Sequence, residues 1–413
     1  MDLQKTLDHY PTLSLAERDR RWAVARRVMD VTGVDALVVL GLRSRENFDA
    51  WFTNEALGGI VVMPRSADPM YLTTGHIRVL SRHDCVGGQR ERWVSDIRVG
   101  EVARNMQEFL LQHRLVHARI GVVGLDAVFV TEPLGLAPHA IWKQVTEALP
   151  AVHFVDVSMA FANALLPRSA EELVLLRRAA AIGEVATRAF VEKAVPGARE
   201  SDAYAAVMQA IYALGGNVTL PTMIMRSGPE SMGWFAPEWL WMGGEPRRLE
   251  RGDMIAAEIF PTYAGMESQQ QLAVSIGPAT PMQKMLGAVA RESYEAGLQA
   301  IRPGATFSQL CERMQQPLTA AGCWNIGPLV QTVPVIYNSA QMLGTDKQPG
   351  LAGIPLPPAV PMTGDFEIQE GMVFAMEPNA LRNKERVCIG GTVVVTADGC
   401  EELNVLANRL IET

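Results

Sequence analysis

The pattern of apolar and polar positions divides the first part of the chain, up to about residue 160, into alternating strands and helices. Short apolar runs predict buried strands, and segments with apolar residues at helical spacing predict the helices between them. Ser14 has the side chain expected of an N-cap for the first of these helices. This alternation is typical of an α/β domain. The predicted strands cover residues 34–41, 59–63, 70–73 and 119–124, and the predicted helices cover 14–31, 101–113 and 138–149.

After residue 160, pairs of helices precede strands, and this order occurs twice. Ser169 followed by Glu172 has the spacing of a capping box at the start of the first pair. The sequences AVPGA (194–198) and IRPGA (301–305) are near copies, and each ends the first helix of its pair. This repetition predicts an internal duplication in which two halves close around a shared site. The predicted helices cover residues 169–195, 201–214, 281–301 and 308–321.

Each half carries a glutamate inside an apolar strand. Residues 254–259 form an apolar run interrupted only by Glu258, and a turn at 261–265 leads to a second strand at 267–275. Residues 371–378 (GMVFAMEP) repeat the order of glycine, apolar strand, glutamate and proline, with Glu377 as the glutamate. A carboxylate in an apolar strand is costly unless it has partners or a function. If the two strands lie side by side in one sheet, the two glutamates could meet at its centre.

Charge and composition narrow the class of protein. The chain has 37 basic and 45 acidic residues, a net charge of -8, and no basic run, which argues against nucleic acid as the main partner. No apolar run approaches the length of a bilayer span, and the N-terminus lacks the apolar core of a secretory signal. The five cysteines, Cys388 among them, are scattered and form no CxxC pair, as expected of inert free thiols. We therefore expect a cytoplasmic protein without a membrane partner.

All seven histidines of the chain precede residue 154. The strands that carry the two glutamates and everything after them contain none. Chemistry centred on those strands therefore has no histidine base or ligand unless a partner chain or another domain supplies one.

Four segments of the chain resemble the creatinase/prolidase/methionine aminopeptidase family, whose fold is called pita-bread. They are a linker and first helix at 165–182 (LLPRSAEELVLLRRAAAI), a hairpin at 251–268 (RGDMIAAEIFPTYAGMES), a strand at 370–378 (EGMVFAMEP), and a final strand and turn at 392–404 (TVVVTADGCEELN). Within this family the Phe260-Pro261 and Ala264-Gly265 pairs resemble creatinase most.

The resemblance covers nearly the whole chain, and it implies the domain organisation. Residues 1–160 would form a creatinase-like N-terminal α/β domain. Residues 161–413 would form the α+β pita-bread domain, with its internal pseudo-two-fold duplication. The resemblance also implies a homodimer in which the N-terminal domain of one subunit covers the pocket of the other. That arrangement could bring His76 or His83 to the site.

The resemblance also locates the metal ligands of the metal-dependent members, which are two aspartates, one histidine and two glutamates. In this chain the aspartate positions hold Glu258 and Gln269, and the histidine position falls near Val330. The glutamate positions hold Glu377 and Gly390. Divalent ions need several anionic or imidazole ligands each. We therefore predict no catalytic metal and no cofactor.

Creatinase itself works without a metal, using a histidine and glutamates. Its histidine position falls near Trp241, one glutamate position holds Gln271, and the other matches Glu377. The arginine and phenylalanine that bind the carboxylate of its substrate fall near residues 54–56 and are not retained. Creatine is therefore a poor candidate for the substrate.

The two glutamates are the candidate catalytic residues. Two neighbouring carboxylates do not both ionise cheaply, so Glu258 and Glu377 would share a proton and supply an acid and a base without histidine. The alternative for Glu377 is a buried glutamate hydrogen-bonded to backbone. Gln269 and Gln271 are candidates for orienting a carbonyl or a water molecule, or else they form a polar face over buried water.

Three further candidates concern substrate binding. Trp241, with Trp234 and Trp239 nearby, could form an apolar or cation-binding wall. The alternative is plain core packing, which we favour for two of the three. Tyr263 and Arg226 are candidates for hydrogen bonds to a substrate.

The function that we favour from the sequence is metal-independent hydrolysis of a C–N bond in an amide, ureido or amidino group of a small amino-acid-like molecule. A lyase or isomerase reaction with the same acid/base pair stays open. The alternative is a catalytically inactive pita-bread protein that binds a peptide, a small ligand or a partner. The sequence does not identify the substrate.

Overall fold

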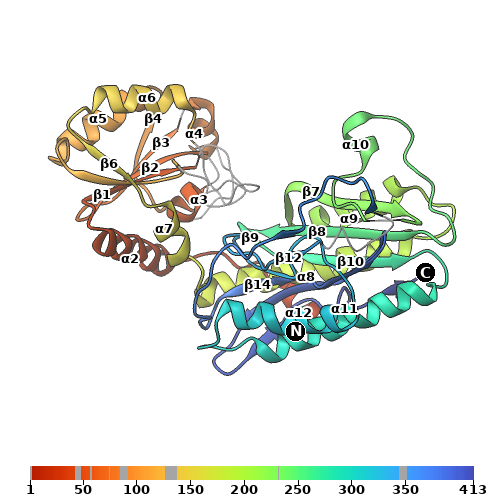
Figure 1. Cartoon of the computed structure of the whole chain (residues 1–413). Coiled ribbons are helices and arrows are strands. Elements are labelled where there is room, and N and C mark those ends of the chain that lie inside the picture. The colour runs from red at the N-terminus through yellow and green to blue at the C-terminus, as the bar shows by residue number, and fades with distance from the viewer. Residues whose placement is uncertain are drawn as a thin grey trace. The chain divides into compact units, whose positions relative to one another are not determined.

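The computed structural model describes residues 2–41, 48–55, 58–73, 75–83, 92–125, 137–230, 232–343 and 351–413 (Figure 1). Its contacts divide the chain into two compact units, residues 12–165 and residues 1–11 together with 166–413. None of the described helices combines the length and the apolar character that crossing a membrane requires.

The first unit is built on a six-stranded mixed sheet in the order β4-β3-β2-β1-β5-β6. Strand β1 pairs antiparallel with β2 and parallel with β5. This is the α/β arrangement that the sequence pattern predicts. The strands are β1 (Ala36–Leu40), β2 (Gly59–Pro64), β3 (Met70–Thr73), β4 (Asp96–Val99), β5 (Arg119–Val123) and β6 (His153–Asp156). The helices are α2 (Leu15–Thr32), α3 (Phe48–Thr53), α4 (His76–His83), α5 (Val102–Gln112), α6 (His139–Ala148) and α7 (Ser158–Ala164).

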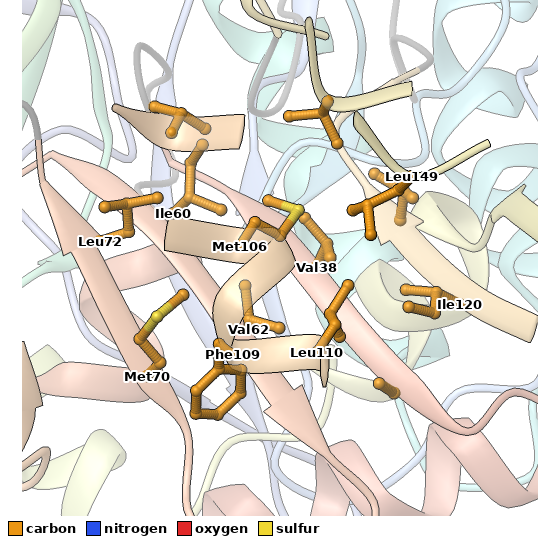
Figure 2. Packing of buried hydrophobic residues seen from close by; sticks show 14 of the residues in the cluster. Val38, Ile60, Val62, Met70, Leu72, Met106, Phe109, Leu110, Ile120 and Leu149 are labelled. Carbon is orange, nitrogen blue, oxygen red and sulfur yellow. The ribbon is translucent and has the colours of Figure 1, made fainter. Parts of the chain in front are cut away.

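Helix α5 forms the core of this unit with the sheet. Met106, Phe109 and Leu110 lie three and four residues apart, so they point to the same side of the helix. Figure 2 shows them packed over the sheet, where Val38 of β1 and Val62 of β2 are register partners. All five side chains are buried, and the apolar area that they remove from water stabilises the unit.

The second unit contains a nine-stranded sheet whose main path is β11-β14-β17-β10-β8-β7. The first half of the unit supplies β7, β8 and β10, and the second half supplies β11, β14 and β17 in mirrored order, which confirms the predicted duplication. The main strands are β7 (Asn217–Gly228), β8 (Met254–Tyr263), β10 (Gln270–Ser275), β11 (Val330–Thr332), β14 (Val373–Met376) and β17 (Gly390–Val395). The edge strands are β9 (Met266–Glu267), β18 (Cys400–Glu402) and β19 (Ile411–Glu412).

Helices cover one face of this sheet (Figure 1). The pairs are α8 (Ala170–Lys193) with α9 (Glu200–Ala213), and α11 (Pro281–Ala300) with α12 (Phe307–Ala320). The Ser169 capping box predicted from sequence begins α8. Gln270 of β10 lies against Gly183 of α8, and Met376 of β14 lies against Gly297 of α11. Because side chains alternate along a strand, the residues that follow these two, Gln271 and Glu377, face away from the helices.

One predicted strand differs from the structure. Strand β8 does not end before Pro261 but continues to Tyr263, and the chain reverses at Ala264 and Gly265, both with positive φ. The stretch before the final strand forms a separate strand, because β16 (Glu385–Cys388) pairs with β15 (Asn379–Arg382) in a two-stranded sheet and only β17 joins the large one.

The stretch 348–361, which is rich in proline and glycine, lies partly outside the described residues. Its described part, from residue 351 onward, is irregular except for β13 (Ala359–Val360), which pairs with β12 (Gln341–Met342).

The N-terminal segment belongs to the second unit because Arg178 of α8 holds it. This buried guanidinium donates hydrogen bonds to the backbone oxygens of Leu7 at 2.8 Å and Leu214 at 3.0 Å. It also lies over the rings of Tyr10 and Tyr263, at 3.8 and 4.8 Å from their centroids. The segment includes the short helix α1 (Leu3–Asp8). Sequence reasoning had grouped these residues with the first domain, because the contacts that hold them come from residues far away in the chain.

Candidate active site

The two glutamate-bearing strands are not neighbours, because β17 and β10 lie between β14 and β8. The glutamates nevertheless lie on one row of the sheet. Glu258 is the register partner of Gln271, and Gln271 is the partner of Gly390. Glu377 follows Met376, the partner of Gly391, so it falls opposite Gly390. Both carboxylates face away from the helices and are buried, with exposed fractions of 1% for Glu258 and 0% for Glu377.

An amide holds Glu377 in place. The Nε2 of Gln331, on β11, donates to Glu377 Oε1 at 2.6 Å and to Gln269 Oε1 at 3.0 Å. Sequence reasoning missed Gln331, although it lies next to Val330, where the family resemblance had located a histidine. The signal available was a glutamine in an otherwise apolar stretch, and that signal alone does not indicate a partner.

The network continues from Gln269 toward the edge of the sheet. Gln269 Nε2 donates to Glu267 Oε1 at 2.7 Å, and Thr219 Oγ1 donates to Glu267 Oε2 at 2.6 Å. The backbone nitrogen of Gln269 also donates to Thr392 Oγ1 at 2.8 Å. Gln269 is therefore fixed on both sides and cannot turn freely toward a ligand.

Cys388 lies close to Gln271 and Glu377. Its Sγ is 3.8 Å from Gln271 Oε1 and 3.8 Å from the backbone oxygen of Glu377. Burial raises the pKa of the thiol to about 12; the positive charge of Arg386 opposes this rise, and the negative charges of Glu377 and Glu258 add to it. The thiol is therefore neutral at ordinary pH and donates its hydrogen, and both carboxylates lie within electrostatic reach of it.

Arg386 of β16 is a second residue that sequence reasoning missed. Its side chain is 3% exposed, and the guanidinium lies 5.3 Å from the ring centroid of Trp234. Trp234 in turn lies against Gly327, which has a positive φ and leaves room for the indole. Of the three tryptophans considered as a wall, Trp234 is therefore the one that approaches the cluster through a described contact.

The other candidate binding residues lie elsewhere. Trp241 is on the five-residue helix α10 (Glu238–Met242) with 63% of its surface exposed. Arg226 pairs with Glu238, with 2.9 Å between Arg226 Nη1 and Glu238 Oε1. Tyr263 donates its hydroxyl hydrogen to the backbone oxygen of Pro11 at 3.1 Å, so it anchors the N-terminal segment.

Residues of the first unit that the resemblance had singled out are only partly described. His76 begins helix α4 and is exposed, whereas the side chain of His83 lies outside the described set. Of the stretch 54–56, residue 56 lies outside it as well.

The cluster thus combines two carboxylates, three amides, a guanidinium and a thiol (Glu258, Glu377, Gln269, Gln271, Gln331, Arg386 and Cys388), with no imidazole among its described side chains. Two carboxylates in one buried site can exchange a proton with a ligand in both directions. The amides and the guanidinium supply hydrogen-bond donors that fix its orientation.

Comparison with known proteins identifies the family. The profile of metallopeptidase family M24 matches residues 174–397, more than half of the chain. The probable dipeptidase PepE of Mycobacterium tuberculosis (strain ATCC 25618 / H37Rv) is 27% identical over 298 residues, which cover 68% of this chain and 72% of that protein. Creatinase of Bacillus sp. (strain B-0618) is 24% identical over 185 residues, which cover 42% of each chain.

Solved structures share the fold over almost the full length. The X-Pro aminopeptidase of Thermotoga maritima MSB8 superposes with a TM-score of 0.71 at 16% identity, covering 95% of this chain and 99% of that one. Dipeptidase PepE of Mycobacterium ulcerans gives a TM-score of 0.71 at 20% identity, covering 97% and 99%. Together with the duplicated pita-bread unit, the profile match over more than half of its length shows that the chain belongs to metallopeptidase family M24.

Proposed function

We propose that this protein hydrolyses a C–N bond of a small amino-acid-like molecule without a catalytic metal, with Glu377 as general base and Glu258 as general acid. The relatives named as a probable dipeptidase and an X-Pro aminopeptidase make the amide bond of a peptide the first choice among C–N bonds. The observation that carries the proposal is the burial of both carboxylates on one face of the sheet, around Cys388.

The donor set does not fit the metal that the family name implies. At the position of the last glutamate ligand, Gly390 has a φ of +136°, and a Cβ built there would lie 1.8 Å from the backbone oxygen of Met376. This backbone therefore accepts no side chain, and no ligand, at that position. Among the described residues, no three His, Cys, Asp or Glu side chains gather in a way that could hold an ion.

The amides oppose a metal as well. Gln269 is neutral, and its Oε1 already accepts a hydrogen bond from Gln331. Gln331 directs an N–H group at Glu377, so a hydrogen-bond donor and not a cation lies against Oε1 of that carboxylate. Divalent ions prefer anionic oxygen or imidazole ligands, and of the five positions that hold ligands in the metal-dependent members only those of Glu258 and Glu377 carry one here. We therefore derive no step of the reaction through a metal.

The proposed reaction balances with the two glutamates alone. Ionised Glu377 takes a proton from water while the water oxygen attacks the carbonyl carbon. Protonated Glu258 gives its proton to the nitrogen as the C–N bond breaks. The products are a carboxylic acid and an amine, and transfer of the proton from Glu377 to Glu258 restores the starting state. Acid–base catalysis of this kind contributes about 10²- to 10⁴-fold to a rate.

The test is an assay of purified protein against dipeptides, including X-Pro dipeptides, and against ureido and amidino acids. Release of the amine is followed before and after dialysis with EDTA, and metal content is measured on the same batch. Glu377→Gln should keep the fold and lose about 10²- to 10⁴-fold in kcat. Glu184→Gln is the matched control, because Glu184 is also buried but accepts a hydrogen bond from the Val405 backbone nitrogen, at 2.8 Å, outside the cluster.

Two results would reject the proposal. One is activity that EDTA abolishes and stoichiometric zinc, manganese or cobalt restores. The other is a Glu377→Gln protein that turns over substrate as fast as the unmodified protein. If no substrate is cleaved and Glu377→Gln leaves the binding of peptides unchanged, the protein is a binding protein on a catalytic fold.

A further inference from the structure

Arg386 is a buried cation without an anionic partner in the described part of the chain. Its side chain is 3% exposed, yet it forms no ion pair with any described carboxylate. Removing a charge from water without a counter-charge is strongly unfavourable, so buried arginines are normally paired. An unpaired one beside a polar cluster indicates that the counter-charge comes from a ligand.

The hydrogen bonds of Arg386 leave part of its guanidinium unused. Nη1 donates to the backbone oxygen of Met232 and Nη2 to that of Ile326, both at the long distance of 3.4 Å. The Nε–H is buried and has no hydrogen-bond acceptor among the described residues. Arginine normally uses its planar set of donors on carboxylates and other anionic oxygens.

A second unused donor lies close by. Gln271 is buried, and its Oε1 accepts from the Cys388 thiol at 3.8 Å, but its Nε2 has no acceptor within the described ranges. Leaving a buried N–H group without an acceptor is costly, and native structures rarely do so. Arg386 also interacts with the Cys388 thiol, so Arg386 of β16 and Gln271 of β10 both lie close to this sulfur.

We infer that Arg386 and Gln271 form a receptor for a negatively charged oxygen, and that in the proposed hydrolysis this oxygen is the one that develops on the attacked carbonyl. The inference rests on the proposed function for the identity of that oxygen. It also explains how a site with a poor donor set for metals can polarise a carbonyl: a fixed guanidinium and an amide replace the Lewis acid.

The electron balance follows from the proposed reaction. When the water oxygen bonds to the carbonyl carbon, the π electrons of the C=O bond move onto its oxygen, and Arg386 and Gln271 donate hydrogen bonds to that oxygen. When the C–N bond breaks, the electrons return to re-form C=O and the nitrogen leaves with the proton from Glu258. Losing one such donor lowers kcat by about 10²- to 10³-fold in other enzymes.

Anion binding tests the receptor without any need for turnover. Trp234 lies under the Arg386 guanidinium, so an anion that reaches Arg386 should change the fluorescence of this indole. Acetate and methylphosphonate are titrated at constant ionic strength with sodium chloride, and Trp234→Phe identifies the contribution of Trp234 among the eight tryptophans. The expected result is a saturable change with unmodified protein that is absent from Arg386→Gln and at least tenfold weaker in affinity in Gln271→Met.

Arg382→Gln is the matched control. Arg382 lies on β15, the strand paired with β16, and its Nη2 donates to a backbone oxygen, that of Ala321. Arg382 has the same charge as Arg386 and also donates to a backbone oxygen, but it does not face Cys388. This variant should therefore bind both probes as the unmodified protein does. If Arg386→Gln fails to fold, Gln271→Met, an unbranched substitution without a donor, decides the question.

A kinetic experiment then distinguishes a catalytic from a structural role. With a substrate found in the activity assay, Arg386→Gln and Gln271→Met should lower kcat about 10²- to 10³-fold with little change in KM. Added guanidinium ion should restore part of the activity of Arg386→Gln and none of the activity of Gln271→Met.

The outcomes separate the two proposals. Probe binding that is equal in Arg386→Gln and unmodified protein, or absent from both, overturns the receptor. Probe binding that depends on Arg386 in a protein that cleaves nothing supports the receptor and overturns the proposed hydrolysis. If the protein is active and Arg386→Gln changes KM but not kcat, Arg386 does not stabilise the developing oxyanion, and that assignment is overturned.

Discussion

Removing the amide of Gln331 should loosen the strands around Glu377. Gln331→Met keeps an unbranched side chain of similar length but deletes the Nε2 that donates to Glu377 and Gln269, at 2.6 and 3.0 Å. A hydrogen bond to an ionisable group contributes about 1.5–3 kcal/mol and a neutral one about 1 kcal/mol. Allowing for the added apolar contact of methionine, the expected loss is about 2–4 kcal/mol in the opening free energy of these strands.

Hydrogen exchange followed by mass spectrometry measures this loss locally. At about 1.4 kcal/mol per factor of ten, backbone amides of β10 and β14 should exchange about 30- to 1,000-fold faster in the variant. Peptides from β1 and β5 serve as an internal control, because these strands belong to the other compact unit and should exchange at unchanged rates.

Gln315→Met is the control substitution. Gln315 is on α12, is partly exposed, and donates to Thr319 Oγ1 at 3.4 Å near the surface, so its loss should change stability by no more than about 0.5 kcal/mol. A rise in exchange of less than about threefold in β10 and β14 of Gln331→Met would contradict this prediction, because the two hydrogen bonds would then contribute little to holding Glu377.

Two further predictions concern the same face of the sheet. Gly390→Ala should lower the free energy of unfolding by at least about 3 kcal/mol, because a strained backbone alone costs about 1–3 kcal/mol and the new Cβ meets the Met376 oxygen. Gly399→Ala is the control: Gly399 has open space around it, so this variant should melt at the same temperature as the unmodified protein. Equal melting temperatures for the two variants would contradict the observed backbone. Cys388, with its pKa of about 12, should resist iodoacetamide at pH 8, where only about 10⁻⁴ of it is thiolate. It should react after the protein is unfolded in urea. Labelling is measured by mass spectrometry, and rapid labelling of the native protein would refute the burial of this thiol.

The thiol also sets a pH dependence of stability. The pKa of Cys388 in the folded protein lies above the ordinary value of 9.0. Its contribution to stability is therefore complete below the unfolded pKa and is lost as the pH rises from about 9 toward 12. This loss accompanies the breaking of its contacts with Gln271 and Glu377.

Much of the architecture was readable from short stretches of sequence. The capping box at Ser169 and the near-identical Pro-Gly turns at 196–197 and 303–304 predicted the two helix pairs and the duplication that the structure contains. These signals depend on residues within a few positions of one another, so no knowledge of distant contacts is needed. The same holds for the apolar strands that carry Glu258 and Glu377.

The residues that surround those glutamates could not be predicted from such local signals. The mirrored strand order inserts β10 and β17 between β8 and β14, so the glutamates share a row of the sheet without being on adjacent strands. Gln331, Arg386 and Cys388 join them from other strands, β11 and β16, whereas Tyr263, predicted as a binding residue, anchors the N-terminal segment instead.

The sequence by itself determined the two helix pairs, the duplication and which acidic residues lie in apolar strands, because capping, periodicity and turn chemistry are local. Only the tertiary structure decided which polar groups meet there and which donors stay unused. Hydrogen bonds between side chains depend on strand order, register and backbone angles such as the positive φ of Gly390, and these are settled by packing across the whole unit.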